Sequence, residues 1–264
     1  GLCRTEHMFF EEPKLTSFQK MIISETTEER KENLKAILPL QEKDFYGIIK
    51  TMEGRDVTIR LLDPPLNEFV QAETPDLAKA LAKKLGVKVD FIEKKYSELN
   101  EHNPMLGHRG CRLGITFPEI TAMQPRAILS AACELKKEGK NPMPEIMVPL
   151  IGTLNEFKQQ KGVILKAAAE VFEEYGEKID FEIGTMIEIP RAALIADRIA
   201  EEAEYFSFGT NDLTQMTFGY SRDDIASFLP VYLEKKILKV DPFQVLDQAG
   251  VGQLVKMAVE KGRA

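Results

Sequence analysis

Two acidic residues and two arginines stand out because each lies at or just beyond the end of a stretch that predicts a β-strand. Glu188 follows Gly184–Ile187, Asp212 follows Gly209-Thr210-Asn211, and Arg4 and Arg60 lie near the ends of two earlier stretches. In a parallel α/β barrel, side chains at these strand ends point into the active site. Two carboxylates without His or Cys suit Mg²⁺, and guanidinium groups suit phosphate or carboxylate oxygens. The pattern predicts a site for a small, multiply anionic ligand and a divalent cation.

The same four residues also admit a structural interpretation. A buried carboxylate without a partner is costly, so Glu188 and Asp212 could instead form salt bridges with arginine at the barrel mouth. The arginines could serve only to balance Glu6, Asp63 or Glu188. Two arginines converging on two carboxylates favour ligand binding over charge balance, but the residue types alone leave both interpretations open.

A short turn led by glycine, Gly209-Thr210-Asn211-Asp212, follows a predicted strand at 205–209. Its backbone N–H groups could bind a carboxylate, because glycine permits close approach of a ligand. The alternative is an ordinary Asn/Asp turn that leads into a helix N-cap.

Short β-like stretches alternate with longer helical ones, which predicts a parallel α/β sheet. The predicted strands are an initial stretch ending before Glu6, Asp56–Asp63, a weaker one at Arg112–Ile115, Glu145–Leu150, Asp180–Glu188 and Tyr205–Gly209. The predicted helices are Glu28–Leu38, ended by Pro39, then Pro118–Glu138, Leu154–Tyr175, Arg191–Glu202 and Pro242–Gly262. An insertion between Pro64 and Pro104 carries two short helical patterns, at Leu77–Leu85 and Asp90–Leu99. Near-continuous apolar strands indicate burial on both faces.

These elements predict an α/β fold of the TIM-type (β/α)8 barrel class, with about six of the eight strands present and an insertion after the second strand. The chain begins inside a strand and stops directly after a helical pattern, so we expect residues 1–264 to be one barrel domain, incomplete at both ends. Open sheet edges would then be exposed in the isolated chain.

Composition excludes several classes of protein. The 264 residues carry 35 Lys and Arg against 42 Asp and Glu, a net charge of −7, which argues against a general nucleic-acid or membrane-surface binder. The longest stretch without charged residues or histidine, Ile146–Asn155, is too short to cross a bilayer. Three cysteines without metal-ligand spacing favour a reducing compartment, so we expect a cytoplasmic protein, with an organelle as the alternative.

Read together, the strand ends resemble the pyruvate, phosphate dikinase family of phosphoenolpyruvate-utilising enzymes. The segments that carry the resemblance are Gly1–Phe9, Val57–Leu66, Asn103–Arg112, Gly184–Ala193 and Phe206–Gln215, in the family's order. The resemblance implies a C-terminal barrel that binds phosphoenolpyruvate and pyruvate. In this family, a phosphohistidine on a separate swivelling domain exchanges its phosphoryl group with pyruvate enolate; the whole enzyme, a homodimeric phosphoprotein, also binds ATP.

The resemblance also implies roles for individual residues. Arg4 and Arg60 would clamp the transferring phosphoryl group, and Glu188 and Asp212 would ligate Mg²⁺. Gly209, Thr210, Asn211 and Asp212 would contact the pyruvate portion, with Asn211 also near the phosphoryl group, and Glu188 would contact substrate as well as metal. On this basis Arg4, Arg60 and Asn211 are the predicted catalytic residues.

Parts of the family pattern have no counterpart in this sequence. Neither the phosphorylated histidine with its Gly-rich loop, nor the nucleotide-binding domain, nor the cysteine that protonates the enolate is found, since Cys3, Cys111 and Cys133 lie elsewhere. We therefore expect no complete dikinase turnover from residues 1–264 alone. The alternatives are a phosphoenolpyruvate synthase or another phosphoenolpyruvate-utilising phosphotransferase domain, a Mg²⁺-dependent pyruvate-enolate lyase, and a non-catalytic module for binding or dimerisation.

Overall fold

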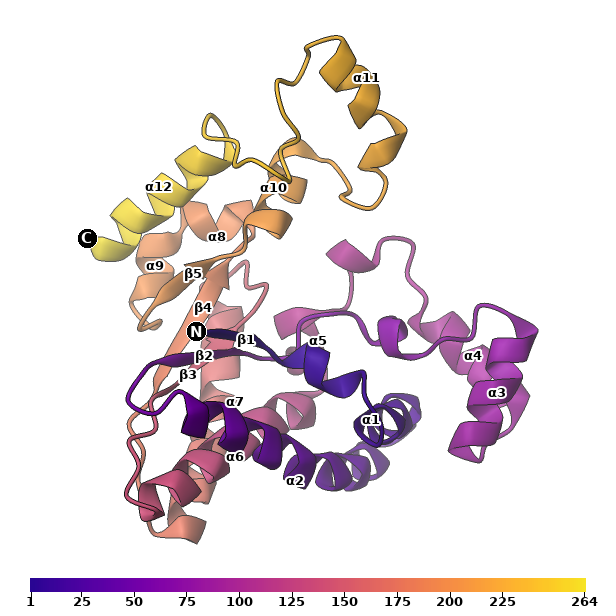
Figure 1. Ribbon diagram of the computed structural model, residues 1–264, viewed down its shortest axis with the longest axis vertical. Helices are drawn as coiled ribbons and strands as arrows, with labels where there is room; N and C mark the ends of the chain where they lie inside the picture. The colour runs from indigo at the N-terminus through magenta and orange to yellow at the C-terminus, as the bar shows by residue number, and fades with distance from the viewer. The chain divides into compact units, whose positions relative to one another are not determined.

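The computed structural model describes residues 1–264 and contains five β-strands (Figure 1). They are β1 (Leu2–Arg4), β2 (Val57–Arg60), β3 (Pro144–Val148), β4 (Glu182–Ile187) and β5 (Phe206–Phe208). The sheet order is β1-β2-β3-β4-β5, and the pairs β1–β2, β2–β3 and β4–β5 are parallel. Parallel strands in chain order are typical of TIM-type barrels, whereas a doubly wound sheet reverses its order. The predicted fold class is confirmed.

The number of strands is one fewer than the sequence predicts. The predicted strand at Arg112–Ile115 is wrong, because these residues belong to the helix α5 (Gly110–Thr116). A short apolar stretch does not by itself distinguish a strand from a buried helix. Here Gly110 takes a φ of 56°, and its N–H donates to the carbonyl of Asp63 at 2.9 Å. These features start a helical turn where the apolar residues alone suggested a strand.

The helices connect the strands. They are α1 (Lys14–Ile23), α2 (Thr27–Thr51), α3 (Pro75–Leu85), α4 (Val89–Leu99), α5, α6 (Pro118–Lys137), α7 (Leu154–Tyr175), α8 (Pro190–Leu194), α9 (Ala196–Ala200), α10 (Thr210–Phe218), α11 (Leu229–Glu234) and α12 (Val251–Arg263). Short 3-10 turns are η1 (Thr5–Phe9), η2 (Leu66–Phe69), η3 (Pro104–Leu106) and η4 (Ile225–Ser227). The predicted insertion is confirmed, since α3 and α4 lie between β2 and β3. None of these helices has both the length and the apolar character that a bilayer crossing requires.

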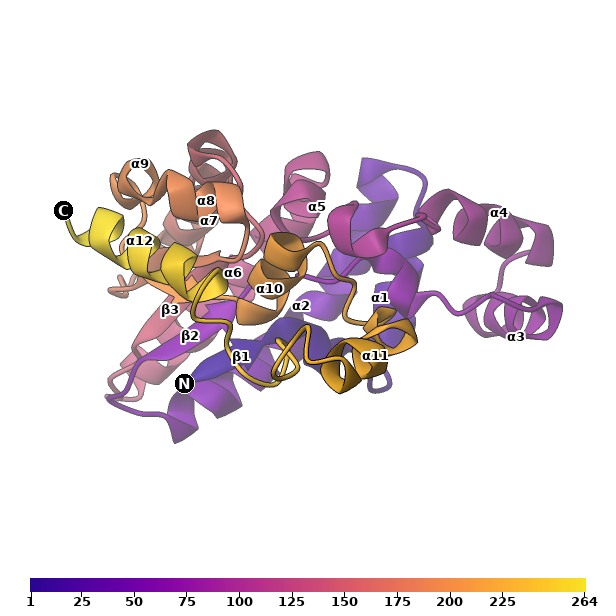
Figure 2. The same ribbon diagram turned by 90° about the horizontal axis from the view of Figure 1, so that it is seen from above.

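The chain divides into two compact units. The first unit is Gly1–Met147 with Gln159–Glu182, and the second unit is Val148–Lys158 with Ile183–Ala264. In the first unit, strands β2 and β3 are largely buried, in agreement with their apolar sequences. Figure 1 shows α1 running beside α2, with which it is in contact. The helices α3 and α4 also lie against each other in both views (Figures 1 and 2).

An aromatic cluster anchors the turn that follows β1 in the first unit. Phe9 of η1 stacks on Phe18 of α1 with ring centroids 4.2 Å apart, and Phe69 of η2 meets Phe18 edge-on at 4.7 Å. All three rings are fully buried or nearly so. Burial of each such side chain is worth roughly 1.5–3 kcal/mol. The cluster therefore fixes the chain just after Arg4, where the sequence predicts site residues.

In the second unit, α12 packs against α8 and α9 (Figure 1). Gly209 follows β5, and α10 begins at the next residue. Glu188 and Ile189 separate β4 from α8, whose first residue is Pro190. Proline suits this first helical position because its fixed φ is already helical and the missing N–H has no helical partner there. The sequence therefore produces two tight strand-to-helix turns in this unit.

Three helix boundaries differ from prediction. Pro39 does not end a helix, because α2 continues through it to Thr51. The predicted helix Arg191–Glu202 is interrupted at Ile195 and forms α8 and α9. The predicted helix Pro242–Gly262 begins only at Val251. There the Asp247 carboxylate accepts the N–H groups of Gly250 and Val251 at 2.9 and 3.1 Å, which is the role of a helix cap.

Candidate functional site

In the first unit, Arg60 lies in a buried chain of ion pairs. Its Nη2 is 2.5 Å from Oε1 of Glu6, and its Nη1 is 3.1 Å from Oδ2 of Asp63. Asp63 in turn accepts Arg109 Nη2 on both carboxylate oxygens, at 3.0 and 2.9 Å. All four residues are at most 8% exposed. Two carboxylates and two guanidinium groups thus balance in charge, and each orients its neighbour.

The local sequence brings these charges together. Thr5 Oγ1, at the start of η1, donates to the carbonyl of Arg60 at 2.9 Å and ties the end of β1 to the end of β2. Glu6 is therefore held beside Arg60, while Asp63 approaches from the other side. The charge-balance interpretation of Arg60 is confirmed for Glu6 and Asp63. It does not exclude ligand binding, because guanidinium carries five N–H donors.

Arg4, the other predicted arginine, differs from Arg60 in its surroundings. It lies at the end of β1, it is exposed, and no acidic group lies within ion-pair distance of it. The two predicted arginines are therefore not equivalent: Arg60 is rigidly oriented by Glu6 and Asp63, whereas the charge of Arg4 is not offset by a paired carboxylate.

Cys3 is the nearest thiol to these residues in the sequence. Burial and the negative charges of Glu6 and Asp44 raise the pKa of Cys3 to about 11. A thiol with that pKa is almost wholly protonated at neutral pH, and the thiolate is the nucleophilic form. Cys3 is therefore not an activated nucleophile in this site.

In the second unit, the Glu188 side chain is fully buried. Its Oε1 accepts the backbone N–H of Leu150 at 2.7 Å. Its Oε2 lies against Gly209, where an added Cβ would clash with it. The structure thus brings together two of the predicted residues, Glu188 and Gly209, from the ends of β4 and β5.

The segment Gly209-Thr210-Asn211-Asp212 starts helix α10. Gly209 is at the N-cap position, where no side chain caps the helix, and the following residues form the first turn. Thr210 and Asn211 are exposed, and Asp212 is buried. The alternative of an Asn/Asp turn that leads into a helix N-cap differs from the structure, because the N-cap is Gly209 and Asn211 and Asp212 already lie within α10. A helix start presents N–H groups and favours negative charge.

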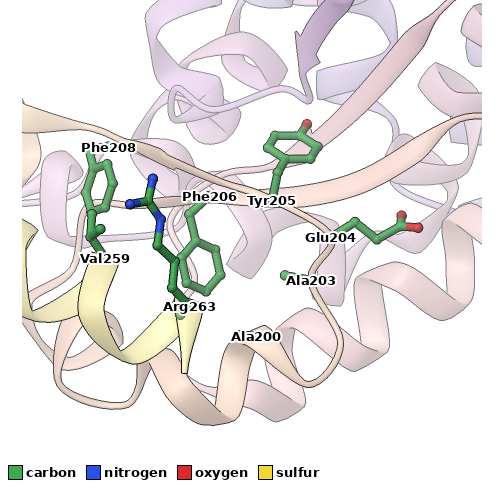
Figure 3. A pocket seen from close by; sticks show the side chains of 9 residues that line it. Ala200, Ala203, Glu204, Tyr205, Phe206, Phe208, Val259 and Arg263 are labelled. Carbon is green, nitrogen blue, oxygen red and sulfur yellow. The ribbon is translucent and has the colours of Figure 1, made fainter.

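One pocket of the second unit does not belong to this site. It lies between β5 and α12 and has a volume of about 470 Å³. Figure 3 shows the side chains of Phe206, Phe208 and Arg263 in it. Its lining includes neither Glu188 nor any residue of 209–212. It borders β5, the last strand of the sheet, so we interpret it as a hollow at the sheet edge.

Gly209 is predicted to tolerate no side chain. A Cβ there would meet Glu188 Cβ at 2.7 Å and Met186 Sδ at 2.8 Å, in addition to the carboxylate. We expect Gly209→Ala to destabilise the fold by about 1–3 kcal/mol through overpacking and to displace the Glu188 carboxylate. Chemical denaturation measures the first effect, and Mn²⁺ titration measures the second if Glu188 holds a cation.

The matched control for this substitution is Gly162→Ala in α7, where an added Cβ meets nothing within 4 Å. Removing a glycine from a helix interior stabilises by roughly 0.5–1 kcal/mol. If Gly209→Ala were as stable as the parent and bound metal equally well, the close approach of Glu188 to Gly209 would be wrong.

The whole chain, residues 1–264, matches the model of the family described as PEP-utilising enzyme, PEP-binding domain. The chain therefore belongs to this family, as its motifs predict. It is 59% identical over 265 residues to pyruvate, phosphate dikinase 1, chloroplastic, of Arabidopsis thaliana, and 58% identical over 266 residues to the chloroplastic pyruvate, phosphate dikinase of Flaveria pringlei. It is 55% identical over 264 residues to pyruvate, phosphate dikinase of Clostridium symbiosum.

These matches include 100% of this chain but only 28% of each plant protein and 30% of the bacterial one. The chain thus spans about three tenths of the length of these relatives. Their names are those of phosphotransferase enzymes, and the predicted resemblance to this enzyme family is confirmed.

The sequence interpretation did not place Glu6, Asp63 and Arg109 among the site residues. Each is a polar residue near a predicted strand end, and the sequence indicates Glu6 and Asp63 only as residues that balance the charge of the arginines. The signal for Arg109 is an arginine directly before Gly110 and close to the wrongly predicted strand at Arg112–Ile115. Which carboxylate pairs with which arginine depends on distances between strands, and no spacing in the sequence gives these.

Proposed function

We propose that this chain is the phosphoenolpyruvate- and pyruvate-binding domain of a pyruvate, phosphate dikinase. In the whole enzyme, a swivelling phosphohistidine domain of the same protein exchanges its phosphoryl group with pyruvate enolate. The overall reaction is ATP + pyruvate + phosphate = AMP + phosphoenolpyruvate + diphosphate. Membership in the family across residues 1–264 and the names of the relatives support this proposal. We also propose that the enzyme is a homodimer.

Glu188 and Asp212 are the residues that we propose to hold Mg²⁺. Both are buried carboxylates, and Mg²⁺ prefers oxygen ligands of this kind. Because Gly209 has no Cβ, the Glu188 carboxylate can lie directly against the start of α10. When bound, Mg²⁺ supplies Lewis-acid polarisation of the pyruvate carbonyl and stabilisation of enolate charge.

The remaining predicted residues bind and orient the substrate in this proposal. Arg60, fixed by Glu6 and Asp63, and the unpaired Arg4 offset charge on the phosphoryl oxygens. The N–H groups at the start of α10, at Thr210 and Asn211, bind the carboxylate of pyruvate. The side-chain amide of Asn211 donates to the phosphoryl group.

The names of the relatives favour the dikinase reaction over a phosphoenolpyruvate synthase, another phosphotransferase of this kind, or a Mg²⁺-dependent lyase. The plant relatives are named as chloroplastic. We therefore propose the cytoplasm or an organelle of this type as the compartment of this protein.

The observation that carries the proposal is the buried Glu188 carboxylate, held by Leu150 N–H and facing Gly209 at the start of α10. Calorimetric titration of the full-length protein with phosphoenolpyruvate, with and without Mg²⁺, tests it. We expect phosphoenolpyruvate binding to require Mg²⁺ and to weaken by more than about 100-fold in Asp212→Ala. Losing even an outer-sphere partner of a metal lowers the metal affinity by roughly 10–100-fold, and losing a direct ligand should cost more.

The matched control is Asp223→Ala, which removes an exposed carboxylate of the same unit. This variant should bind phosphoenolpyruvate as the parent does. Equal affinity in Mg²⁺ and in a chelator would contradict the proposal, as would equal losses in both variants.

A further inference from the structure

Leu150 has an unusual backbone conformation between β3 and α7. Its φ is 65°, in the left-handed region, and its side chain is fully buried. Residues other than glycine, asparagine and aspartate seldom adopt this region, because Cβ crowds the following carbonyl oxygen. Such strain persists only where the surroundings impose it, and it is concentrated at functional sites.

The residues after Leu150 fix the loop in place. The N–H groups of Gly152 and Thr153 both donate to Oε2 of Glu156 at 2.8 Å, and Thr153 Oγ1 accepts the N–H of Glu156 at 3.1 Å. Arg191 Nη1 donates to the carbonyl of Gly152 at 2.5 Å. The start of α7 and the residue after Pro190 therefore both hold this loop. These contacts hold the chain two and three residues beyond the strained conformation at Leu150.

The same residue makes a hydrogen bond to a proposed metal ligand. The N–H of Leu150 donates to Oε1 of Glu188 at 2.7 Å, and the positive φ sets the direction that the chain takes beyond this donor. A bond of this length from N–H to carboxylate is typical of the charge-assisted kind. The opposite side of the same carboxylate faces Gly209. The carboxylate plane is therefore fixed from one side by a backbone donor and confined on the other by a residue without a side chain.

We propose that Leu150 is a positioning residue whose strained backbone orients the Glu188 carboxylate for a divalent cation. This inference rests on the proposed function, in which Glu188 ligates Mg²⁺. Metal ligands are oriented by hydrogen bonds from groups behind them, and losing one such partner typically costs 10–100-fold in metal affinity. The role belongs to the backbone of Leu150 rather than to its side chain.

The test replaces the amide N–H of residue 150 by an ester oxygen, by incorporating the α-hydroxy analogue of leucine into the full-length protein. The readout is Mn²⁺ affinity without substrate, measured by electron paramagnetic resonance. We expect affinity to fall about 10-fold or more. The control is the same ester at Ile164, also fully buried, in α7. It should leave Mn²⁺ affinity within about twofold of the parent, because a helix amide far along α7 does not contact Glu188.

Two ordinary substitutions give an independent reading. Leu150→Gly keeps the N–H and adopts a positive φ freely, so we expect Mn²⁺ affinity within about threefold of the parent although a buried side chain is lost. Leu150→Val keeps an apolar side chain but disfavours this φ, so we expect weaker binding. If Leu150 acted only through its buried side chain, Leu150→Val would bind Mn²⁺ more tightly than Leu150→Gly.

The inference and the proposed function fail in different ways. If Glu188→Gln abolishes Mn²⁺ binding while the Leu150 ester binds as the parent does, or while Leu150→Gly also loses binding, the role of Leu150 is wrong. If Glu188→Gln itself binds Mn²⁺ with parental affinity, the proposed metal site is wrong, and the inference falls with it.

Discussion

On the proposed function, replacing Glu188 with glutamine is expected to abolish Mg²⁺-dependent binding of oxalate, an enolate mimic, and the formation of phosphoenolpyruvate by the full-length protein. Glutamine has nearly the same shape, and its carbonyl oxygen can still accept the N–H of Leu150, which lies 2.7 Å from Oε1 in the parent. The fold is therefore retained while the negative charge is lost. A metal ion contributes several kcal/mol of charge stabilisation, and each 1.36 kcal/mol is tenfold in rate. We expect the rate to fall by about 10³-fold or more.

The control for this substitution is Glu201→Gln, which makes the same chemical change at an exposed position of the second unit. Its oxalate affinity and turnover should equal those of the parent. Thermal denaturation of both variants checks that neither has lost the fold. A Glu188→Gln protein that retained Mg²⁺-dependent oxalate binding would show that the cation lies elsewhere.

The sequence was sufficient for the strands that carry the site. The sequence predicts strands at Asp56–Asp63, Glu145–Leu150, Asp180–Glu188 and Tyr205–Gly209. The structure contains β2, β4 and β5 within those limits, and β3 begins one residue earlier, at Pro144. These segments are rich in apolar residues and are bounded by proline, glycine or charged residues, so the local pattern is enough to predict them. The strand ends follow directly, and with them the positions of Arg60, Glu188 and Gly209.

The sequence was misleading where tertiary packing overrides a local signal. Pro39 lies inside α2 because that helix is fixed on both sides of the proline. A reciprocal cap between Thr26 and Glu29 starts the helix, and Phe45 and Ile49 bury its later turns. Proline in a helix interior costs about 3 kcal/mol, which burial of two large apolar side chains offsets at roughly 1.5–3 kcal/mol each.

The connections around the candidate site could not be read from the residues. The residue type at position 150 does not predict the positive φ of Leu150, because leucine seldom adopts this conformation. Nor does spacing show that Glu6 pairs with Arg60 while Asp63 is shared between Arg60 and Arg109. Those pairings depend on η1 folding back over the end of β2, which is fixed by Thr5 and by the burial of Phe9. Sequence motifs locate such residues, but packing decides their partners.

Arg60→Leu is expected to destabilise the fold by about 3–5 kcal/mol and to abolish phosphoenolpyruvate binding. Removing one partner of a buried ion pair leaves an uncompensated charge, which typically costs that much. Here Glu6 loses its ion-pair partner, whereas Asp63 keeps Arg109. Both carboxylates are at most 8% exposed, so water compensates little. Urea denaturation of the full-length protein measures the loss of unfolding free energy.

Two further variants separate stability from binding. Arg126→Leu also removes an arginine that pairs with two carboxylates, Glu170 and Glu174, but both carboxylates are more than half exposed. Exposed pairs contribute about 0–1 kcal/mol, so this control should be nearly as stable as the parent.

Arg60→Lys keeps the charge but replaces the planar fork by a single ammonium. It should recover most of the stability and still bind phosphoenolpyruvate at least about 10-fold more weakly. Parental affinity in Arg60→Lys would show that Arg60 serves Glu6 and Asp63 alone, and the clamp on the phosphoryl group would then have to be assigned to other residues.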